Sequence, residues 1–440
     1  MRELFLEGVR CFRDEQRIPI RPITLLVGEN SSGKSTVLSM IRAAWDVAFK
    51  GAEPDFNEKP FTMGGYDAIA HYHGGQGKRV SEFKIKSITE LPRLRGRETT
   101  KREVVGTFSE RGGQPALTEW SVRQGELFLS IVALPDARAK ARVELGKELA
   151  LEDVVIEMER GIHFPQDAFF SVRRRLFEKF AGAKAPAGKQ FEVLESVSDV
   201  LPGAALLRRF PRPIAGAPIR SRPQRTYNPE RDLPEPEGSH VPMGLAALSA
   251  AGPEQFRLLA ERLARYGSAA GLFSKLEVKR LGKKAGDPFQ LLVAVEKFPF
   301  NLLDVGYGVS QVLPIVVDAL TAPEGQTFLL QQPEVHLHPR AQAAFGSLLV
   351  EQAADRRQTF IVETHSDYLV DRVRMDVRAK KGRAGLRPED VVIIFFERDR
   401  GRVNIHPIEI DNTGSLVNVP SGYRRFFLDE ERRLLGLGSN

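Results

Sequence analysis

The sequence predicts an α/β fold with a mixed central sheet, an antiparallel β-subdomain near the N-terminus and a mostly helical insertion. Continuous apolar runs at residues 23–27, 327–332 and 359–362 are typical of buried parallel strands. Stretches between about 80 and 133 resemble antiparallel strands, whereas much of 136–270 has helical composition. The predicted parts are an N-terminal lobe at 1–135, the insertion at 136–270 and a C-terminal lobe at 271–440.

Composition restricts the class of protein. The chain has 440 residues, of which 42% are hydrophobic and 28% charged, so wholesale disorder is excluded. No apolar run approaches the ~20 residues needed to span a bilayer, and Glu3 and Glu7 interrupt the apolar residues of the N-terminus, which is not typical of a signal peptide. A single cysteine, Cys11, excludes an intramolecular disulfide and a multi-thiolate metal site. We therefore expect a cytoplasmic protein without a membrane partner.

The elements follow in order along the chain. Residues 36–50 have helical spacing, and 51–78 read as an irregular loop. Residues 137–161 and about 166–182 are predicted as helices, followed by a Pro-rich connector. Residues 254–266 form an amphipathic helical pattern, and strands resume at 276–282 and 289–298. No repeat of 20–50 residues and no heptad run is present, so long coiled-coil arms are excluded.

The net charge of +7 permits a polyanionic partner without requiring one, since 64 basic residues face 57 acidic ones. The basic residues gather in three clusters. These are Arg93, Arg95, Arg97, Lys101 and Arg102; Arg173, Arg174 and Arg175; and Arg208, Arg209, Arg212, Arg220, Arg222 and Arg225. Two interpretations stay open: a solvated face with nucleotide or interface contacts, and nucleic-acid binding.

One segment matches the phosphate-loop pattern G-x-x-x-x-G-K-[ST] without a mismatch: Gly28, Glu29, Asn30, Ser31, Ser32, Gly33, Lys34 and Ser35. It follows an apolar strand and precedes a helix, which is the context that gives the motif meaning. Its glycines let backbone N–H groups surround a phosphate, and the helix N-terminus adds positive dipole. Lys34 can then reach the terminal phosphates of ATP, and Ser35 can bind Mg²⁺.

Polar residues follow the other two predicted parallel strands. Gln331 and Gln332 end the first, with Glu334 two residues later, and Glu363 and His365 follow the second. Upstream, the turn at 306–311 leads into a predicted helix over 311–322. Ser310 could simply cap this helix, and Pro314 would then lie in its first turn, where the missing N–H costs nothing.

At these residues the chain resembles a family. The order GENSSGKST, DVGYGVSQVLPI, FLLQQPEVHLHP and ETHSDYLVDRV is similar to that of ABC-type AAA-family P-loop ATPases related to OLD nucleases, RecF and SMC proteins. Several ATPases of bacterial anti-phage systems belong to this branch. The resemblance covers residues 1 to about 410, and the insertion matches only loosely.

The resemblance implies roles for individual residues. The segment from Gly28 to Thr36 would be the Walker A loop, and 328–332 the Walker B strand. Gly306, Gly308, Ser310 and Gln311 would be the signature that contacts the γ-phosphate held by the other protomer of a head-to-tail homodimer. Residues 336–339 would be the D-loop, and His365 the switch histidine. The alternatives are a metal site at His336 and His338, and a purely structural His365.

The sequence departs from the family pattern at the Walker B strand. Relatives end this strand in two acids or in an acid followed by glutamine, whereas Gln331 and Gln332 supply neither negative charge for Mg²⁺ nor a proton acceptor. Gln331 would still be the residue nearest the metal, and Gln332 would stand at the catalytic position. Glu334 and Glu363 are the two candidate substitutes. The sequence thus predicts secure ATP binding and slow hydrolysis.

The residues after His365 carry no recognisable effector. Residues 391–396 and 403–408 are predicted as a strand hairpin, and 422–437 as an amphipathic helix, with no room for the Toprim domain of OLD nucleases. The carboxylates near the hairpin turn, Glu397 and Asp399, are read as a solvated hairpin end rather than a metal site. The resulting hypothesis is an ATP-gated dimeric or higher-order switch, or scaffold, that acts with a separately encoded effector in DNA maintenance or anti-phage defence. The alternatives are an ATPase like RecF that binds DNA directly and, with weaker support, a transporter ATPase subunit.

Overall fold

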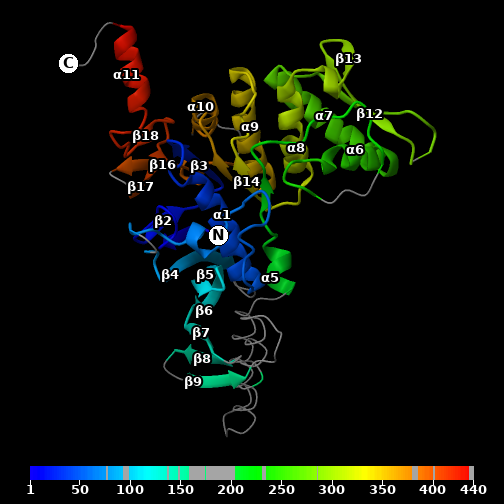
Figure 1. Cartoon of the computed structure of the whole chain (residues 1–440). Coiled ribbons are helices and arrows are strands. Elements are labelled where there is room, and N and C mark those ends of the chain that lie inside the picture. Colours follow the sequence, from blue (N-terminus) through cyan, green and yellow to red (C-terminus); the bar gives the residue numbers. More distant parts are fainter. Residues whose placement is uncertain are drawn as a thin grey trace. The chain divides into compact units, whose positions relative to one another are not determined.

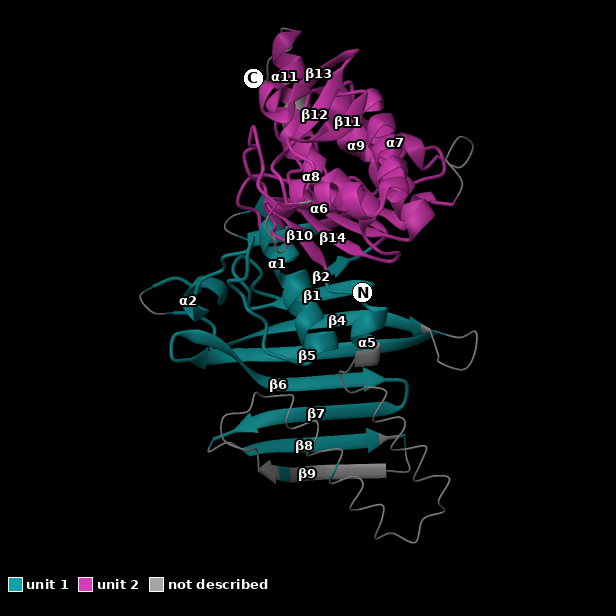
Figure 2. Ribbon diagram, turned by 90° about the vertical axis from the view of Figure 1, so that its right-hand side faces the viewer, with its two compact units in different colours: residues 1–20, 35–212, 398–405 teal, residues 21–34, 213–397, 406–440 magenta. Residues whose placement is uncertain are grey.

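The computed structural model describes residues 1–75, 78–92, 99–135, 138–146, 149–157, 174, 204–229, 234–284, 286–378, 385–399 and 402–435. The chain forms two compact units, shown in Figure 2. We call residues 1–20, 35–212 and 398–405 the strand unit, and residues 21–34, 213–397 and 406–440 the site unit. These units do not follow the predicted boundaries at residues 135 and 270.

The strand unit contains one antiparallel sheet with the order β2-β1-β4-β5-β6-β7-β8-β9 (Figure 2). Its strands are β1 (Glu3–Glu7), β2 (Gln16–Pro19), β4 (Glu82–Pro92), β5 (Thr99–Arg111), β6 (Gln114–Gln124), β7 (Leu127–Leu134), β8 (Arg138–Leu145) and β9 (Leu149–Glu157). Strands β4 to β7 confirm the antiparallel strands expected between about 80 and 133.

The helix predicted over 137–161 is wrong, because this segment forms the hairpin β8–β9. In β8 the small or apolar residues Ala139, Ala141 and Val143 are buried and alternate with Lys140 and Arg142, which is the period of a strand. Helix-forming residue types had hidden that alternation, so tertiary pairing outweighs local propensity here. The helix predicted around 166–182 lies outside the described residues, apart from Arg174.

The expected helix over 36–50 is present as α1 (Lys34–Trp45) followed by a π-helical turn, η1 (Asp46–Lys50), which ends at Gly51 in the left-handed region. The sheet holds this turn through two buried side chains. Trp120 donates its indole N–H to the carbonyl of Val47 (2.9 Å), and Arg102 donates to that of Ala48 (3.1 Å). Two further short helices are α2 (Tyr66–Ile69) and α5 (Ala204–Arg209).

The site unit is built on a sheet with the order β10-β14-β15-β3-β16-β17-β18. Its strands β3, β14, β16, β17 and β18 are labelled in Figure 1. The strands are β10 (Ile214–Gly216), β14 (Thr327–Gln331), β15 (Thr359–Glu363), β3 (Ile23–Gly28), β16 (Val391–Asp399), β17 (Arg402–Ile410) and β18 (Leu416–Val417). The first five pair in parallel, and β17 pairs with β18 antiparallel. The predicted α/β class, the mixed sheet and the three buried parallel strands are therefore confirmed.

Helices and a small sheet bury the apolar face of this unit. The helices are α6 (His240–Ala251), α7 (Pro253–Ala270), α8 (Tyr307–Thr321), α9 (Pro339–Arg356) and α10 (Asp367–Asp376), with short turns η2 (Leu302–Asp304) and η3 (Pro388–Asp390). The small antiparallel sheet has the order β11 (Lys275–Arg280), β12 (Phe289–Val295) and β13 (Phe298–Asn301). One apolar core joins these elements to β3, β14 and β15. Helix α7 and strands β11 and β12 confirm the sequence predictions.

The C-terminal segment forms α11 (Arg425–Leu434), as its amphipathic pattern predicted. Across the described ranges, no helix combines the length and the apolar character that crossing a membrane requires.

Candidate functional site

The candidate site lies where three neighbouring parallel strands of the site unit end. Strand β15 pairs with both β14 and β3, so their carboxyl ends meet at one edge of the sheet. The phosphate loop follows β3, Gln332 to Glu334 follow β14, and Glu363 to His365 end β15. Ligands of open α/β sheets bind at this edge. The sequence placed these segments correctly because each follows an unmistakable apolar run.

The phosphate loop requires its glycines. Gly28 has φ +136° and Gly33 φ +98°, which side chains rarely adopt, and a Cβ at Gly28 would lie 2.5 Å from the carbonyl oxygen of Phe396. Ser32 is buried and donates to the carbonyl of Glu29 (2.8 Å), while Glu29, Asn30 and Ser31 are exposed. The backbone is therefore fixed in a tight loop by conformation and by an internal hydrogen bond.

Lys34 is the cation of this loop. Only 3% of the residue is exposed, and its Nζ donates to the carbonyls of Gly28 (3.0 Å) and Glu29 (2.6 Å). Nζ also lies 4.0 Å from Oε1 of Glu363, a weak ion pair. Burial lowers the pKa of Lys34, and the Glu363 carboxylate opposes this. The next residue, Ser35, is exposed in the first turn of α1, and the hydroxyl of Thr36 accepts a hydrogen bond from Arg10 (3.4 Å).

Glu334 and His365 are held together. The residue Glu334 is 7% exposed, and its Oε1 accepts the backbone N–H of His365 (2.7 Å). Burial raises the pKa of Glu334, while hydrogen bonds from the His365 and Glu334 amides and the Thr364 side chain, and the Arg220 guanidinium, oppose the shift. Partial desolvation and the positive charge of Lys34 lower the pKa of His365. Its imidazole is therefore neutral at pH 7.

The two glutamines differ in their surroundings. Gln331 is the last residue of β14, and its carbonyl accepts a hydrogen bond from Arg220 Nη2 (3.4 Å). Gln332 adopts φ +43°, and its backbone N–H donates to the carbonyl of Glu363 (2.8 Å). This bond continues the β14–β15 pairing by one residue. The chain then turns, which brings Glu334 back against the end of β15.

The signature segment differs from its prediction in two respects. Helix α8 begins at Tyr307 with Gly306 as N-cap, so Ser310 is not a cap and its hydroxyl donates to the carbonyl of Tyr307 (2.8 Å). Pro314 therefore lies inside the helix, where it cannot donate to the carbonyl of Ser310. Gln311 is 1% exposed, and its Oε1 accepts the backbone N–H of Arg220 (3.2 Å). Both residues are buried in the chain, with Ser310 6% and Gln311 1% exposed.

The loop after Glu334 packs against the signature. A Cβ at Gly308 would lie 2.7 Å from the carbonyl of His336, and the rings of Tyr307 and His336 meet edge to face at 5.0 Å. His338 is the N-cap of α9 and accepts from the amide of Arg340 (3.3 Å). Among the described residues, no group of three His, Cys, Asp or Glu side chains is placed to hold a metal ion. The histidine pair thus has structural contacts on this chain.

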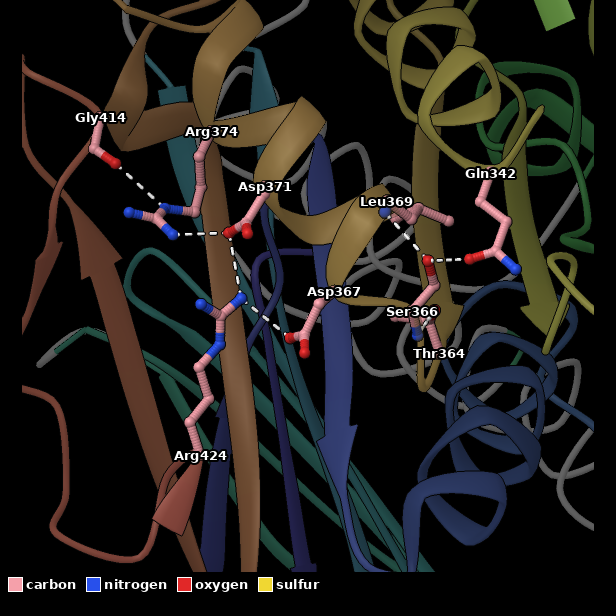
Figure 3. A network of polar contacts seen from close by, with 9 residues as sticks. All are labelled: Gln342, Thr364, Ser366, Asp367, Leu369, Asp371, Arg374, Gly414 and Arg424. Carbon is pink, nitrogen blue, oxygen red and sulfur yellow. Dashed lines mark hydrogen bonds and ion pairs between the residues drawn. The ribbon is translucent and has the colours of Figure 1, made fainter. Parts of the chain in front are cut away.

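Figure 3 shows the network that follows His365. Ser366 caps α10 by accepting from the amide of Leu369 (3.0 Å), and its hydroxyl donates to Gln342 of α9 (2.6 Å). Arg424, the residue before α11, donates to two carboxylates of α10, those of Asp367 (2.8 Å) and Asp371 (3.0 Å). The C-terminal segment is therefore fastened to the helix that begins directly after the predicted switch histidine.

Sequence reasoning missed Arg220. This residue follows the three-residue strand β10, which is too short to recognise in a Pro-rich stretch, and it belongs to the third basic cluster. Other members of that cluster are also engaged within the chain: Arg212 pairs with Asp46 and Glu58, and Arg225 pairs with Asp304. Within this cluster, Arg220 is buried, and Arg212 and Arg225 form ion pairs inside the chain. These three arginines are therefore not free to bind nucleic-acid phosphates.

Comparison with known proteins identifies a family. Residues 23–371 match the family model described as AAA domain, putative AbiEii toxin, Type IV TA system. No curated protein matches the sequence. Among solved structures, the SMC head domain from Thermotoga maritima is 14% identical with a TM-score of 0.42, covering 93% of this chain and 100% of that one.

Two further SMC heads are similar. One, bound to the C-winged helix domain of ScpA, is 12% identical with a TM-score of 0.44, covering 93% of this chain and 97% of that one. The other, with an extended coiled coil and bound to the C-terminal domain of ScpA derived from Pyrococcus furiosus, is 10% identical with a TM-score of 0.42, covering 99% of this chain and 98% of that one. All three TM-scores are below 0.5, so no function is inferred from these similarities.

Proposed function

Because the chain belongs to this AAA-domain family, matched over residues 23–371, we propose that it is an ABC-type ATPase that binds ATP at residues 28–36 and hydrolyses it slowly. The observation that carries the proposal is the arrangement around Lys34. A buried ammonium lies in a loop that only glycines can form, beside the ends of two strands that each supply a buried carboxylate. Such a loop binds the phosphates of a nucleotide.

The two carboxylates are suited to different tasks. Glu363 lies 4.0 Å from Lys34 and so holds the lysine in the loop. Glu334 has one oxygen bound to the His365 amide, while the other, Oε2, is buried without a hydrogen-bond partner among the described residues. A carboxylate with a raised pKa and an oxygen to spare fits the acceptance of a proton from water. We assign this task to Glu334. We assign to His365 the contact with the γ-phosphate of ATP.

The donor set also fits Mg²⁺, which takes one or two carboxylates and phosphate oxygens rather than a full protein cage. The ion would neutralise the terminal phosphates and orient them. Glu363, the carboxylate that is not assigned to proton transfer, would reach it directly or through water, and the assignments of Ser35 and Gln331 to the metal stay predictions. Because the two glutamines add no charge, we expect turnover well below a typical enzyme's ~10 s⁻¹.

We further propose that the protein works as an ATP-dependent homodimer, in the cytoplasm, with a separately encoded effector. Four exposed apolar residues support a second copy as partner, since they lie within ten positions of one another in the sequence and end at the first residue of α8: Phe298, Phe300, Leu303 and Tyr307. Exposed apolar residues gathered in this way mark interaction sites. A role in DNA maintenance or anti-phage defence rests on the family resemblance. Direct DNA binding has less support, given the partners of Arg212 and Arg225.

Steady-state ATP hydrolysis tests the proposed function. Glu334→Gln is expected to lower kcat by roughly 10²–10⁴, the usual value of a general base. Glu363→Gln should instead change ATP affinity rather than kcat, because Lys34 loses the carboxylate that holds it in the loop. Glu324→Gln, an exposed carboxylate of the same unit, is the control and should leave turnover unchanged. Turnover that survives Glu334→Gln would show that the water is activated elsewhere.

A further inference from the structure

Arg220 is a buried cation at the same edge of the sheet. It follows β10, which pairs in parallel with β14, and the residue is 3% exposed. Its backbone N–H donates to Oε1 of Gln311 (3.2 Å), and its Nη2 donates to the carbonyl of Gln331 (3.4 Å). One residue therefore contacts both the signature helix α8 and the end of β14.

The guanidinium is incompletely bonded. Its Nε and Nη1 are buried and lack a hydrogen-bond partner among the described residues, as do Nε2 of Gln311 and Oε2 of Glu334. Leaving a charged donor buried and unpaired is costly, so such groups persist where they serve a function. Burial lowers the pKa of Arg220 to about 10, and the Glu334 carboxylate opposes this shift. Arg220 therefore stays charged at pH 7 and attracts Glu334.

The charge pattern of the site explains why this attraction falls on Glu334. Neither Gln331 nor Gln332 supplies a carboxylate, and Glu363 is close to Lys34. Glu334 is thus the acid left to compensate Arg220, and it has an oxygen available. The structure forms no ion pair or hydrogen bond between these two described side chains, and a small movement that joined the guanidinium to Oε2 would satisfy an unpaired donor and an unpaired acceptor together.

We propose that Arg220 is the positioning residue of Glu334. Its guanidinium orients the carboxylate toward the attacking water, and its backbone ties that orientation to Gln311 of the signature helix. The proposal rests on the proposed function, and it assigns Arg220 to hydrolysis rather than to nucleotide binding. A shift of α8 on dimerisation would then reach Glu334 through Arg220.

The test separates binding from turnover in Arg220→Met and Arg220→Lys. Arg220→Met should lower kcat about 10- to 100-fold, the cost of misplacing a catalytic group by about 1 Å. Its calorimetric ATP affinity should stay within about threefold of wild type. Arg220→Lys keeps the buried charge and should recover part of the rate. Arg222→Met removes the same charge two residues away, at an exposed position, and serves as the matched control.

A double-mutant cycle distinguishes positioning from simple support of the fold. In a Glu334→Gln background, Arg220→Met should cost no further turnover, because the group that it positions is already absent. A cost that is equal in both backgrounds would overturn the proposal, as would lost ATP affinity with unchanged kcat. If the wild type neither binds nor hydrolyses ATP, the proposed function fails instead. In that case the free energy of unfolding can be measured for the wild type, Arg220→Met, Glu334→Gln and the double variant. This second cycle still tests the coupling of Arg220 and Glu334.

Discussion

The chemistry of the site depends on where single charges are buried. Lys34 is compensated by loop carbonyls and Glu363, and Glu334 is bound by the His365 amide. The phosphate loop and both glutamates were predictable, because motif spacing and strand ends are visible in sequence. Arg220 was not, since nothing marks a single arginine after a three-residue strand. The burial of Gln311 was also hidden, because a glutamine in a glycine turn reads as exposed.

The raised pKa of Glu334 predicts how stability changes with pH. Protonation is easier in the folded state, so folding favours the protonated acid and this contribution is lost as pH rises through the folded pKa. Glu334→Gln removes the cost of the buried charge but keeps an acceptor for the His365 amide. The variant should therefore be more stable than wild type at pH 7, and the difference should shrink as pH falls.

Urea unfolding at several pH values measures this difference. The charged group that opposes the shift is the Arg220 guanidinium, and hydrogen bonds from the His365 amide and the Thr364 side chain act in the same direction, so all three must be intact in the comparison. A Glu334→Gln variant that is less stable than wild type at pH 7 would mean that the ionised carboxylate is well compensated. Glu324→Gln, the same exchange at an exposed carboxylate, is the control for the substitution itself.

At the scale of elements, periodicity decides what the sequence can reveal. Strands β3, β14 and β15 are continuous apolar runs, and α7 has a clear amphipathic stripe, so these were predictable. Strand β8 was mistaken for a helix because alanine, lysine and leucine favour helices, and because two of its buried alternate positions hold alanine, a residue with little apolar surface. Helix α8 starts four residues earlier than predicted, because Gly306 rather than Ser310 ends the preceding extended backbone.

The attachment of α11 to α10 gives a prediction at this scale. Arg424 holds the C-terminal segment through Asp367 and Asp371 (Figure 3). Arg424→Ala should raise amide hydrogen exchange in residues 411–435 while leaving ATP affinity unchanged. Arg425→Ala alters the next residue, which is exposed and has only a 3.8 Å pair with Asp429, so exchange should stay as in wild type. Equal exchange in both variants would show that other contacts hold the segment.

At the scale of the whole molecule, the units are discontinuous in sequence. The strand unit takes residues 1–20 and 35–212, and the site unit takes residues 21–34, which include the phosphate loop as far as Lys34, together with residues 213–397. When a chain leaves a unit and later returns to it, changes of composition along the sequence cannot locate the unit boundaries. The predicted boundaries at residues 135 and 270 therefore differ from those of the two compact units. The family match over residues 23–371 likewise includes parts of both units.

Association of two copies is the prediction at this scale. Addition of ATP to the Glu334→Gln variant, which should retain nucleotide, is expected to double the mass measured by light scattering. Tyr307→Arg places a charge on an exposed ring at the start of the signature and should abolish the shift. Tyr72→Arg makes the same change at an exposed site in the strand unit and should not. A dimer of equal stability without ATP would indicate an interface that does not depend on nucleotide.

Calorimetric titration of ATP into wild type and Lys34→Ala tests the central claim most directly. The buried ammonium is the cation of the phosphate loop, and a charged hydrogen bond contributes about 1.5–3 kcal/mol, so affinity should fall at least about tenfold. Lys297→Ala, which removes an exposed lysine from the same unit, should bind like wild type. Unchanged affinity in Lys34→Ala would contradict nucleotide binding at this loop.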